Sequence, residues 1–374
     1  MPALPSSPAE PTVNHLTNGH LPTALRPFLH RALFHGLRKN NGDLRPTAVG
    51  CTYRRLVAKD CLRPYISRLY ELLQPSQVGV GTLRGSEAAV HATCSFMAQT
   101  QGEKVLLKLD VRNAFNSIRL NTVLQAAQTH LPEIYPFIWD CYSSKSSLFH
   151  GDFCFHSATG VQQGGPPGPA LFALAIHGVT SEVKSDLNVW YLGDDCIGGD
   201  PQTVLSKAAF IRNGLSSVGL EINNSKCELL IVNHTTSQER SQTIKLLQDV
   251  FPSISITAPN LWQLLGSPLH QDSAPLHLEA KTKMLDNIIG NLELIEPHQV
   301  FFVLKNVSQS PNSLLTAKCT MLQVQRGTEG VRHSHKNQHG KNMQCVFWRR
   351  KLVKSIPTNQ TCRPGPSFRG RPVC

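Results

Sequence analysis

The sequence predicts an α+β fold, in which an antiparallel sheet carries helices packed on one face. Two observations predict it. Short apolar stretches typical of strands alternate along the chain with stretches of helical composition. The strand-like stretches are residues 105–110, 189–192 and 227–232, and the helical ones are residues 119–130, 169–183 and 203–218. Carboxylates also stand where these strands end or turn, at Asp110 and at the pair Asp194 and Asp195.

The N-terminal part of the chain predicts a hairpin. Residues 1–25 are rich in Pro, Ser, Thr and Asn and are expected to be disordered. The turn signal Asn-Asn-Gly-Asp at residues 40–43 separates residues 31–39 from the extended residues 47–50. This pattern predicts a β-hairpin with a basic tip. Between Gly85 and Gln101, residues 87–93 have helical composition, ahead of the mostly buried strand at 105–110.

The downstream elements carry the carboxylate pair. The apolar residues 169–183 predict the best buried helix of the chain. After it, residues 189–192 and 196–197 predict two paired strands, with Asp194 and Asp195 at the turn between them. An amphipathic helix and the strand at 227–232 follow this hairpin, which completes the alternation that the fold class requires.

Composition indicates a folded body with a basic tail. The 374 residues are 40% apolar and 17% charged, enough for one large domain or about two smaller ones. The net charge is +12, but residues 319–374 hold eleven Lys and Arg against one acid, which leaves +2 for the first 318 residues. The tail is therefore expected to be disordered, and a nucleic-acid contact is its second interpretation.

The cysteines and the N-terminus indicate a soluble, intracellular protein. The eleven cysteines are scattered without any Cys-x-x-Cys pair, which is typical of reduced thiols. The first residues have neither the charged lead nor the apolar core of a secretory signal. The longest apolar stretch, near residues 169–179, is too short to span a membrane.

The carboxylates predict a site for divalent cations. Mg²⁺ prefers oxygen ligands and keeps several waters, so two or three carboxylates suffice to hold it. Asp110 ends an apolar strand, and Asp194 and Asp195 follow 84 and 85 residues later in a second strand region. On spacing alone, however, a single Asp at a strand end is more often a turn or helix-cap residue.

Three segments, in this order, resemble the palm of a reverse transcriptase of the kind encoded by non-LTR retrotransposons. They read KLDVRNAFN at 108–116, QGGPPGP at 163–169 and YLGDD at 191–195. The resemblance extends over residues 31–269. It implies a polymerase palm with partial fingers and a truncated thumb. The implied activity is RNA-directed DNA synthesis from dNTPs on an RNA template and a DNA primer, with two Mg²⁺ ions, or Mn²⁺, as cofactors.

The resemblance also implies roles for single residues. Asp110 and Asp194 or Asp195 would hold the metal ions, and Phe115 would exclude a ribose 2′-hydroxyl. Gln163 and Gly164 would contact the incoming nucleotide and the template. The remaining roles are those of Lys39 and Arg45 on the triphosphate and of Lys226 as the acid that protonates pyrophosphate. Each has a plainer alternative: core packing for Phe115, surface charge for Lys39 and Arg45.

One position departs from the family pattern. Aligned without gaps from Trp190 to Gly199, the chain has Gly193 where the first metal-binding aspartate is expected, and Asp194 takes the second position. Alternatively, the hairpin shifts by one residue and Asp194 becomes the first ligand. Because a shift by one residue turns every side chain to the opposite face of the sheet, we favour the alignment without a gap. It implies that this copy is degenerate and weak or inactive.

The resemblance divides the chain into five regions. They are a disordered N-terminal tail at 1–25, a fingers-like region at 26–103, the palm at 104–270, a thumb remnant at 271–318 and the basic tail at 319–374. Two other functions stay open. The first is a non-catalytic nucleic-acid-binding remnant. The second is another two-metal palm enzyme such as a nucleotidyl cyclase, for which the only indication is Ile-Gly-Gly-Asp at 197–200.

Overall fold

The computed structural model describes residues 16–19, 22, 24–38, 42, 44–99, 102–233, 237–270, 273–292 and 294–300. All of them belong to the first of two compact units, Met1–Gly327, and the second unit, Thr328–Cys374, lies outside the described residues. Lys39, the basic tail and most of the predicted N-terminal tail also lie outside them. Leu16 is an exception within 1–25, because it is fully buried in the core, contrary to the predicted disorder.

A five-stranded sheet lies at the centre of the described fold and confirms the predicted α+β class. Its strand order is β6-β7-β3-β8-β9. The strands are β3 (Lys104–Asp110), β6 (Leu187–Tyr191), β7 (Asp194–Gly199), β8 (Glu228–Asn233) and β9 (Ser255–Ile256). All neighbours pair antiparallel except β8 and β9, which are parallel.

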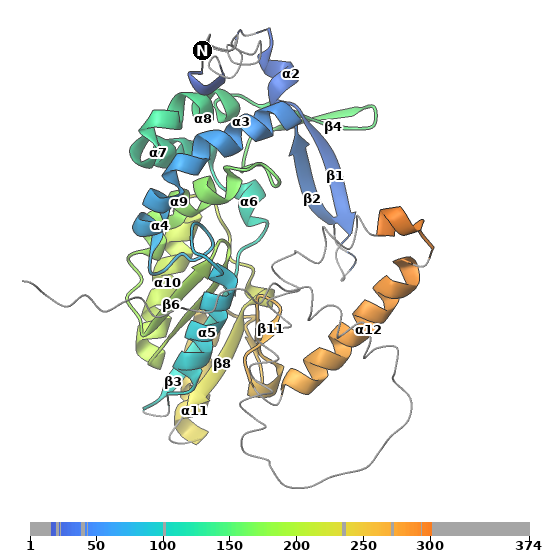
Figure 1. Cartoon of the computed structure of the whole chain (residues 1–374). Helices are drawn as coiled ribbons and strands as arrows, with labels where there is room; N and C mark the ends of the chain where they lie inside the picture. Colours follow the sequence, from blue (N-terminus) through green and yellow to red (C-terminus); the bar gives the residue numbers. More distant parts are fainter. Residues whose placement is uncertain are drawn as a thin grey trace, which may run out of the picture. The chain divides into compact units, whose positions relative to one another are not determined.

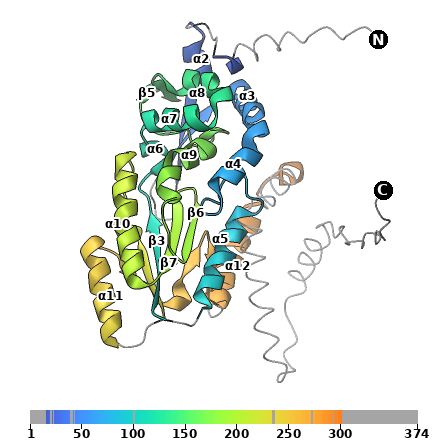
Figure 2. The same cartoon turned by 90° about the vertical axis from the view of Figure 1, so that its left-hand side faces the viewer.

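The two faces of this sheet pack against different helices. Successive side chains of a strand point to opposite faces, and accordingly Leu107 and Leu109 belong to the larger apolar cluster, whereas Leu106 belongs to the smaller one. The larger cluster includes α9 (Gly168–Thr180) and α10 (Pro201–Ser217), and the smaller one includes α5 (Gly85–Met97). Figure 2 shows the sheet between α10 and α5, so helices cover parts of both faces rather than one.

A second, four-stranded sheet confirms the predicted hairpin and extends it. Strands β1 (Ala32–Arg38) and β2 (Leu44–Gly50) pair antiparallel, as the turn signal at 40–43 predicted. The hairpin of β4 (Ser146–His150) and β5 (Phe153–Ser157), which the sequence did not indicate, adds to β1 (Figure 1). The strand order is β2-β1-β4-β5.

Helices occupy most of the remaining described chain. They include α2 (Arg26–His30), α3 (Thr52–Leu62), α4 (Ile66–Leu73), α6 (Ala114–Ser117), α7 (Leu120–His130), α8 (Tyr135–Tyr142), α11 (Ser237–Val250) and α12 (Ala274–Leu292). A small hairpin of β10 (Gln263–Leu264) and β11 (Ser267–Pro268) precedes α12. Among the described helices, none is both long and apolar enough to cross a membrane.

Candidate active site

Asp110 and Asp194 lie opposite each other on neighbouring strands. Asp110 is the last residue of β3, and its register partner on β7 is Asp194. Side chains of directly opposed residues share one face, with Cβ atoms about 5 Å apart. Asp194 is exposed and Asp110 is half-buried, so both carboxylates reach the same open part of the sheet. Two hard oxygen ligands at this separation can hold a divalent cation between them.

Asp195 occupies the opposite face. It pairs with Leu109 on one side and with Trp190 on the other, and its side chain is fully buried. Burial raises the pKa of the Asp195 carboxyl well above its ordinary value, and the nearby charges of Asp194 and Asp110 raise the pKa further. The three predicted carboxylates are therefore adjacent in space but divided between the two faces.

The loop between β6 and β7 consists of Leu192 and Gly193. The sequence predicted that Asp194 and Asp195 form the turn, and this prediction is wrong. Tyr191 pairs with Asp194, so the two aspartates are the first residues of β7. Leu192 has a left-handed backbone with φ of +63°. A Cβ atom added to Gly193 would lie 3.2 Å from Ala114 Cβ and 3.9 Å from Phe172 Cζ. Gly193 thus leaves a small space beside α6 and α9.

The buried side chain of Gln77 holds this loop, a role that the sequence did not reveal. Gln77 Oε1 accepts hydrogen bonds from the backbone N–H of Leu192 at 2.8 Å and of Gly79 at 3.1 Å. Beside it, Trp190 N–H donates to Ser76 O at 2.7 Å. The segment around Gln77 therefore pairs with the outer edge of β6 and fixes the backbone of the loop.

The predicted nucleotide turn lies at the start of α9. Gly164 has φ of +97°, which favours glycine, and a Cβ atom there would lie 3.5 Å from Ala48 O and 3.9 Å from Thr47 Cγ2. Gln163 and Gly164 thus lie against β2, the strand that also contains Arg45. The turn at Gly164 and strand β2 at Ala48, 116 residues apart in the sequence, therefore lie next to each other.

Phe115 belongs to the short helix α6, which follows β3. Its ring stacks on the fully buried ring of Phe172, with centroids 4.8 Å apart and planes 13° apart. Val161 N–H donates to Phe115 O at 2.7 Å, which connects α6 to the chain that enters the nucleotide turn. The half-buried Phe115 is therefore a packing residue, which was the plainer of its two predicted roles.

Lys226 ends the short 3₁₀ helix Asn224–Lys226 and is exposed. Asn223 N–H donates to Asp110 O at 2.8 Å, and Val111 forms a bridge with Ile222. These contacts bring the segment that precedes Lys226 beside the end of β3. Of the two predicted triphosphate cations, only the backbone of Arg45 is described, opposite Leu37 in β1.

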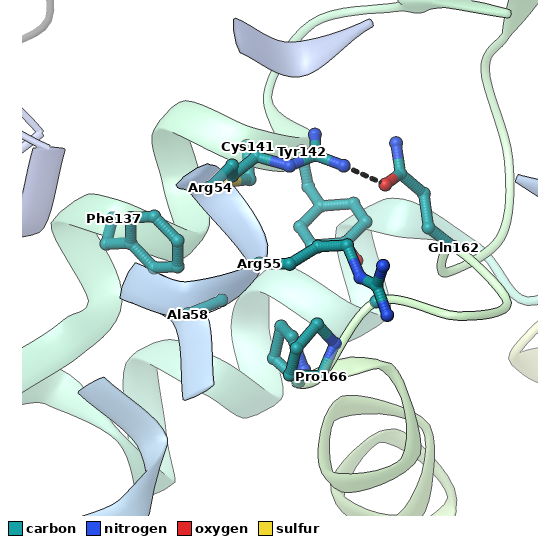
Figure 3. Close-up of a pocket in the computed structure, with 10 residues that line it drawn as sticks. Arg54, Arg55, Ala58, Phe137, Cys141, Tyr142, Gln162 and Pro166 are labelled. Carbon is teal, nitrogen blue, oxygen red and sulfur yellow. Dashed lines mark hydrogen bonds between the residues drawn. The ribbon is translucent and has the colours of Figure 1, made fainter. Parts of the chain in front are cut away.

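Two arginines of α3 lie behind the nucleotide turn, and the sequence had given them no contact. Arg54 is buried, donates to His30 O at 3.2 Å and also donates to Gln162 Oε1. Both arginines, Arg54 and Arg55, line a cavity of about 20 Å³. Figure 3 shows them there together with Tyr142, Gln162 and Pro166. Arg54 thus fixes the residue that precedes Gln163. Only tertiary structure could reveal this contact, because α3 and the turn are distant in sequence.

The described residues contain no group of three or more His, Cys, Asp or Glu side chains arranged to hold a metal ion. Asp195 lies on the other face of the sheet, so only two carboxylates, those of Asp110 and Asp194, share the open face. Such a pair still fits Mg²⁺, which proteins commonly hold through one or two carboxylates together with substrate phosphates.

These features define a palm-like sheet with carboxylates at the end of its central strands. Residues 37–266 match the family described as reverse transcriptase (RNA-dependent DNA polymerase). Since the match covers more than half of the 374 residues, the chain belongs to the reverse transcriptase family. The sequence matches no curated protein.

Two solved structures are similar to this chain. An apo telomerase from Candida tropicalis, truncated from the C-terminal domain, is 13% identical, with a TM-score of 0.40, over 54% of this chain and 50% of that one. A telomerase from Candida albicans, in complex with a fragment of telomeric RNA, is 11% identical, with a TM-score of 0.43, over 55% and 44%. The chain thus spans half or less of these two proteins.

Proposed function

We propose that this chain is the reverse transcriptase domain of a non-LTR retrotransposon and that its metal site lacks one carboxylate. The substrates are an RNA template, a DNA primer and dNTPs. The observation that carries the proposal is the opposition of Asp110 and Asp194 across β3 and β7, at the end of the sheet where the segments of Phe115 and Lys226 also lie. The retrotransposon origin in this proposal is supported by the resemblance of the three sequence segments.

In this proposal, Asp110 and Asp194 hold Mg²⁺. When bound, Mg²⁺ would stabilise negative charge on the phosphates and activate the attacking hydroxyl. Gln163 and Gly164 contact the nucleotide, and Phe115 limits the space at its 2′ position. Lys226 donates a proton to the departing pyrophosphate.

Electrostatic complementarity holds the triphosphate. The guanidinium of Arg45 matches phosphate oxygens with two parallel donors, and Lys39 adds a second positive charge. Arg45 belongs to β2, the strand whose Thr47 and Ala48 lie against Gly164, and Lys39 follows β1 in the sequence. The same charges would bind a nucleic-acid backbone if catalysis were lost.

Gly193 limits the proposed activity. The short loop of Leu192 and Gly193, with Tyr191 paired to Asp194, favours the alignment without a gap, in which Gly193 replaces a metal-binding aspartate. We therefore expect weak or absent catalysis. The same observation favours the second candidate function, a non-catalytic remnant that binds nucleic acid.

The first test is extension of a DNA primer by one nucleotide on an RNA template, with Mg²⁺ or Mn²⁺. We expect little extension by the wild type and a gain with Gly193→Asp, because the added side chain restores a carboxylate. To admit the added Cβ, which would lie 3.2 Å from Ala114 Cβ, Ala114 must shift by a few tenths of an ångström. In the Gly193→Asp background, Asp110→Asn and Asp194→Asn should each lower the rate by a factor of about 10² or more.

Two controls complete this test. Asp249→Asn changes an exposed carboxylate on α11 and should leave the rate unchanged. Asp195→Asn distinguishes the two hairpin alignments, since the alignment without a gap assigns Asp195 no ligand role. A complete loss of extension in Asp195→Asn, together with normal extension in Asp194→Asn, would contradict the proposed ligand pair. If no variant extends the primer but RNA still binds, the non-catalytic function replaces the proposed one.

A further inference from the structure

The four-stranded sheet exposes a cluster of aromatic side chains away from the candidate active site. Phe155 lies opposite Leu148 and Phe153 opposite His150, so all four side chains share one face of the sheet. The Phe34 ring on β1 approaches the ring of Phe155 to 6.1 Å and that of His150 to 6.5 Å. We call Phe34, His150, Phe153 and Phe155 the aromatic face. We propose that the aromatic face binds single-stranded RNA by stacking of bases.

The exposure of these rings is the first argument. Phe153 is 69% exposed and Phe155 is 50% exposed, and four of the five residues of β5 are exposed. Adjoining exposed apolar side chains are uncommon on a monomer and usually mark an interaction surface. His150 Nδ1 hydrogen-bonds to Phe34 O at 3.0 Å, which holds that ring in place on β4. Within the cluster, His150 therefore has little freedom left to lose on binding.

The positive charge of the segments that form this sheet favours a polyanion as the ligand of the aromatic face. The segments 31–50 and 145–157, which form this sheet, contain five Lys and Arg against two acids. The first 318 residues together have a net charge of only +2, so the remainder of that body is slightly negative. The four strands contain no Asp or Glu. Arg38 is exposed and lies four residues after Phe34 on β1, so both side chains are on the same face of the sheet. Exposed aromatic rings beside cations are the combination that binds single-stranded nucleic acid.

The aromatic face is distinct from the nucleotide site. The turn of Gln163 and Gly164 lies against β2, and β5 is at the opposite end of the strand order β2-β1-β4-β5. Three strand spacings separate β2 from β5, or about 14 Å. RNA on the aromatic face would thus be a part of the strand outside the site of copying. The choice of RNA over DNA rests on the proposed function, whereas the stacking surface itself does not.

Fluorescence anisotropy of the full chain with a labelled oligoadenylate RNA of about ten nucleotides tests the proposal. High salt suppresses contacts that depend only on charge. Under these conditions we expect the double variant Phe153→Ala/Phe155→Ala to raise Kd about ten-fold or more, because each stacked base contributes measurably to affinity. The matched control is Phe210→Ala, which removes a 42% exposed ring from α10 and should leave Kd unchanged.

A second measurement locates the RNA directly. RNA that contains 4-thiouridine should crosslink on irradiation to peptides from residues 146–157. An unchanged Kd in the double variant, or crosslinks confined to other segments, would overturn the proposal. So would a change of oligomeric state in light scattering without any change in RNA affinity, since the face would then be a protein interface. In the Gly193→Asp background, Asp110→Asn should abolish extension without changing this Kd, so failure of the proposed catalysis can be told apart from failure of this inference.

Discussion

Gln77 shows how one buried amide can determine the position of a loop, here the one between β6 and β7. Its side chain is fully buried, and its Oε1 satisfies the backbone N–H groups of Leu192 and Gly79. Without this side chain, both half-buried N–H groups would lose the partner that they have in the folded chain. Leaving buried donors unsatisfied costs about 1–3 kcal/mol each.

We therefore expect Gln77→Leu to lower the free energy of unfolding by about 2–4 kcal/mol. Urea denaturation measures this change. Gln125→Leu, at an exposed position of α7, makes the same chemical change without a buried partner and should shift stability by less than about 0.5 kcal/mol. Equal effects of the two substitutions would show that the contact with Leu192 contributes nothing.

The limits of sequence reasoning are also clear at single residues. Asp194 and Asp195 are chemically identical neighbours, and the local pattern predicted a strand without its register. Register depends on which residue of β3 lies opposite, and here Asp110 pairs with Asp194. The contacts of Gln77 and Arg54 connect residues that are more than 100 positions apart, and no local pattern contains them.

The connection between α6 and the nucleotide turn depends on a close backbone approach at Gly160. Gly160 N–H donates to Ile118 O at 2.8 Å, and a Cβ atom at Gly160 would lie 2.5 Å from backbone atoms of Asn116. Only glycine fits there. The next residue, Val161, donates its N–H to Phe115 O. The close contact of Gly160 with Asn116 therefore also positions Phe115, the residue proposed to limit the space at the 2′ position of the nucleotide.

Gly160→Ala should therefore destabilise the protein more than Gly266→Ala. Both glycines have φ of +78°, so both substitutions add the same left-handed strain of about 1–2 kcal/mol. Gly266 has no atom within 4 Å of an added Cβ, whereas Gly160 adds a steric clash that costs about 1–3 kcal/mol more. Thermal unfolding of both variants measures the difference. If their melting temperatures agree, the backbone at Asn116 moves aside without cost.

The helix α2 is fixed to α8 by a buried ionic cluster. His30 Nε2 lies 3.0 Å from Asp140 Oδ2, and Arg26 Nε lies 2.9 Å from Asp140 Oδ1. Burial lowers the pKa of His30, and the positive charges of Arg54 and Arg26 lower it further, against the opposing effect of Asp140. Below its ordinary pKa of 6.5, His30 takes up a proton more readily in the unfolded chain than in the folded one.

Stability should consequently fall as pH decreases through about 6.5, and His30→Gln should weaken this dependence. The Gln side chain can still donate to Asp140 but does not titrate. Urea midpoints at about pH 7.5 and about pH 5.5 give the comparison. His91→Gln, an exposed residue on α5, should retain the wild-type dependence. A parallel loss of stability in wild type and His30→Gln would exclude His30 as the source.

Elements with a regular apolar pattern were predictable, and those without one were not. The continuous apolar residues of β3 and α9 require burial on every side, so sequence and structure agree there. The hairpin of β4 and β5 is rich in Ser and His and largely exposed, so it lacks the alternation that indicates a strand. These strands form because β4 pairs with β1, a contact that the local sequence does not reveal.

For the whole molecule, the position of the charge matters more than its sum. Of the net charge of +12, residues 319–374 account for +10. If this segment contacts the RNA backbone, each phosphate that it neutralises adds about 0.7 to the slope of log Kd against log salt concentration. Binding by the body alone would have a much smaller slope, because that body is nearly neutral.

We expect that replacement of the eleven Lys and Arg of residues 319–374 by Gln reduces the salt slope of RNA binding by several units. Titration of labelled RNA at several salt concentrations measures it. A matched variant in which every Lys of the segment becomes Arg retains the charge and should retain the slope. An unchanged slope in the Gln variant would assign the salt-dependent contacts to the body of the protein.

The two-residue loop between β6 and β7 has a consequence for heredity. Its backbone is determined by Gln77 and by strand pairing on both sides, and neither depends on the side chain at position 193. Codons for aspartate and glycine differ by a single base. A lineage of reverse transcriptases with this loop can therefore lose a carboxylate at this position, or recover it, in one mutational step while the strand pairing around it is inherited.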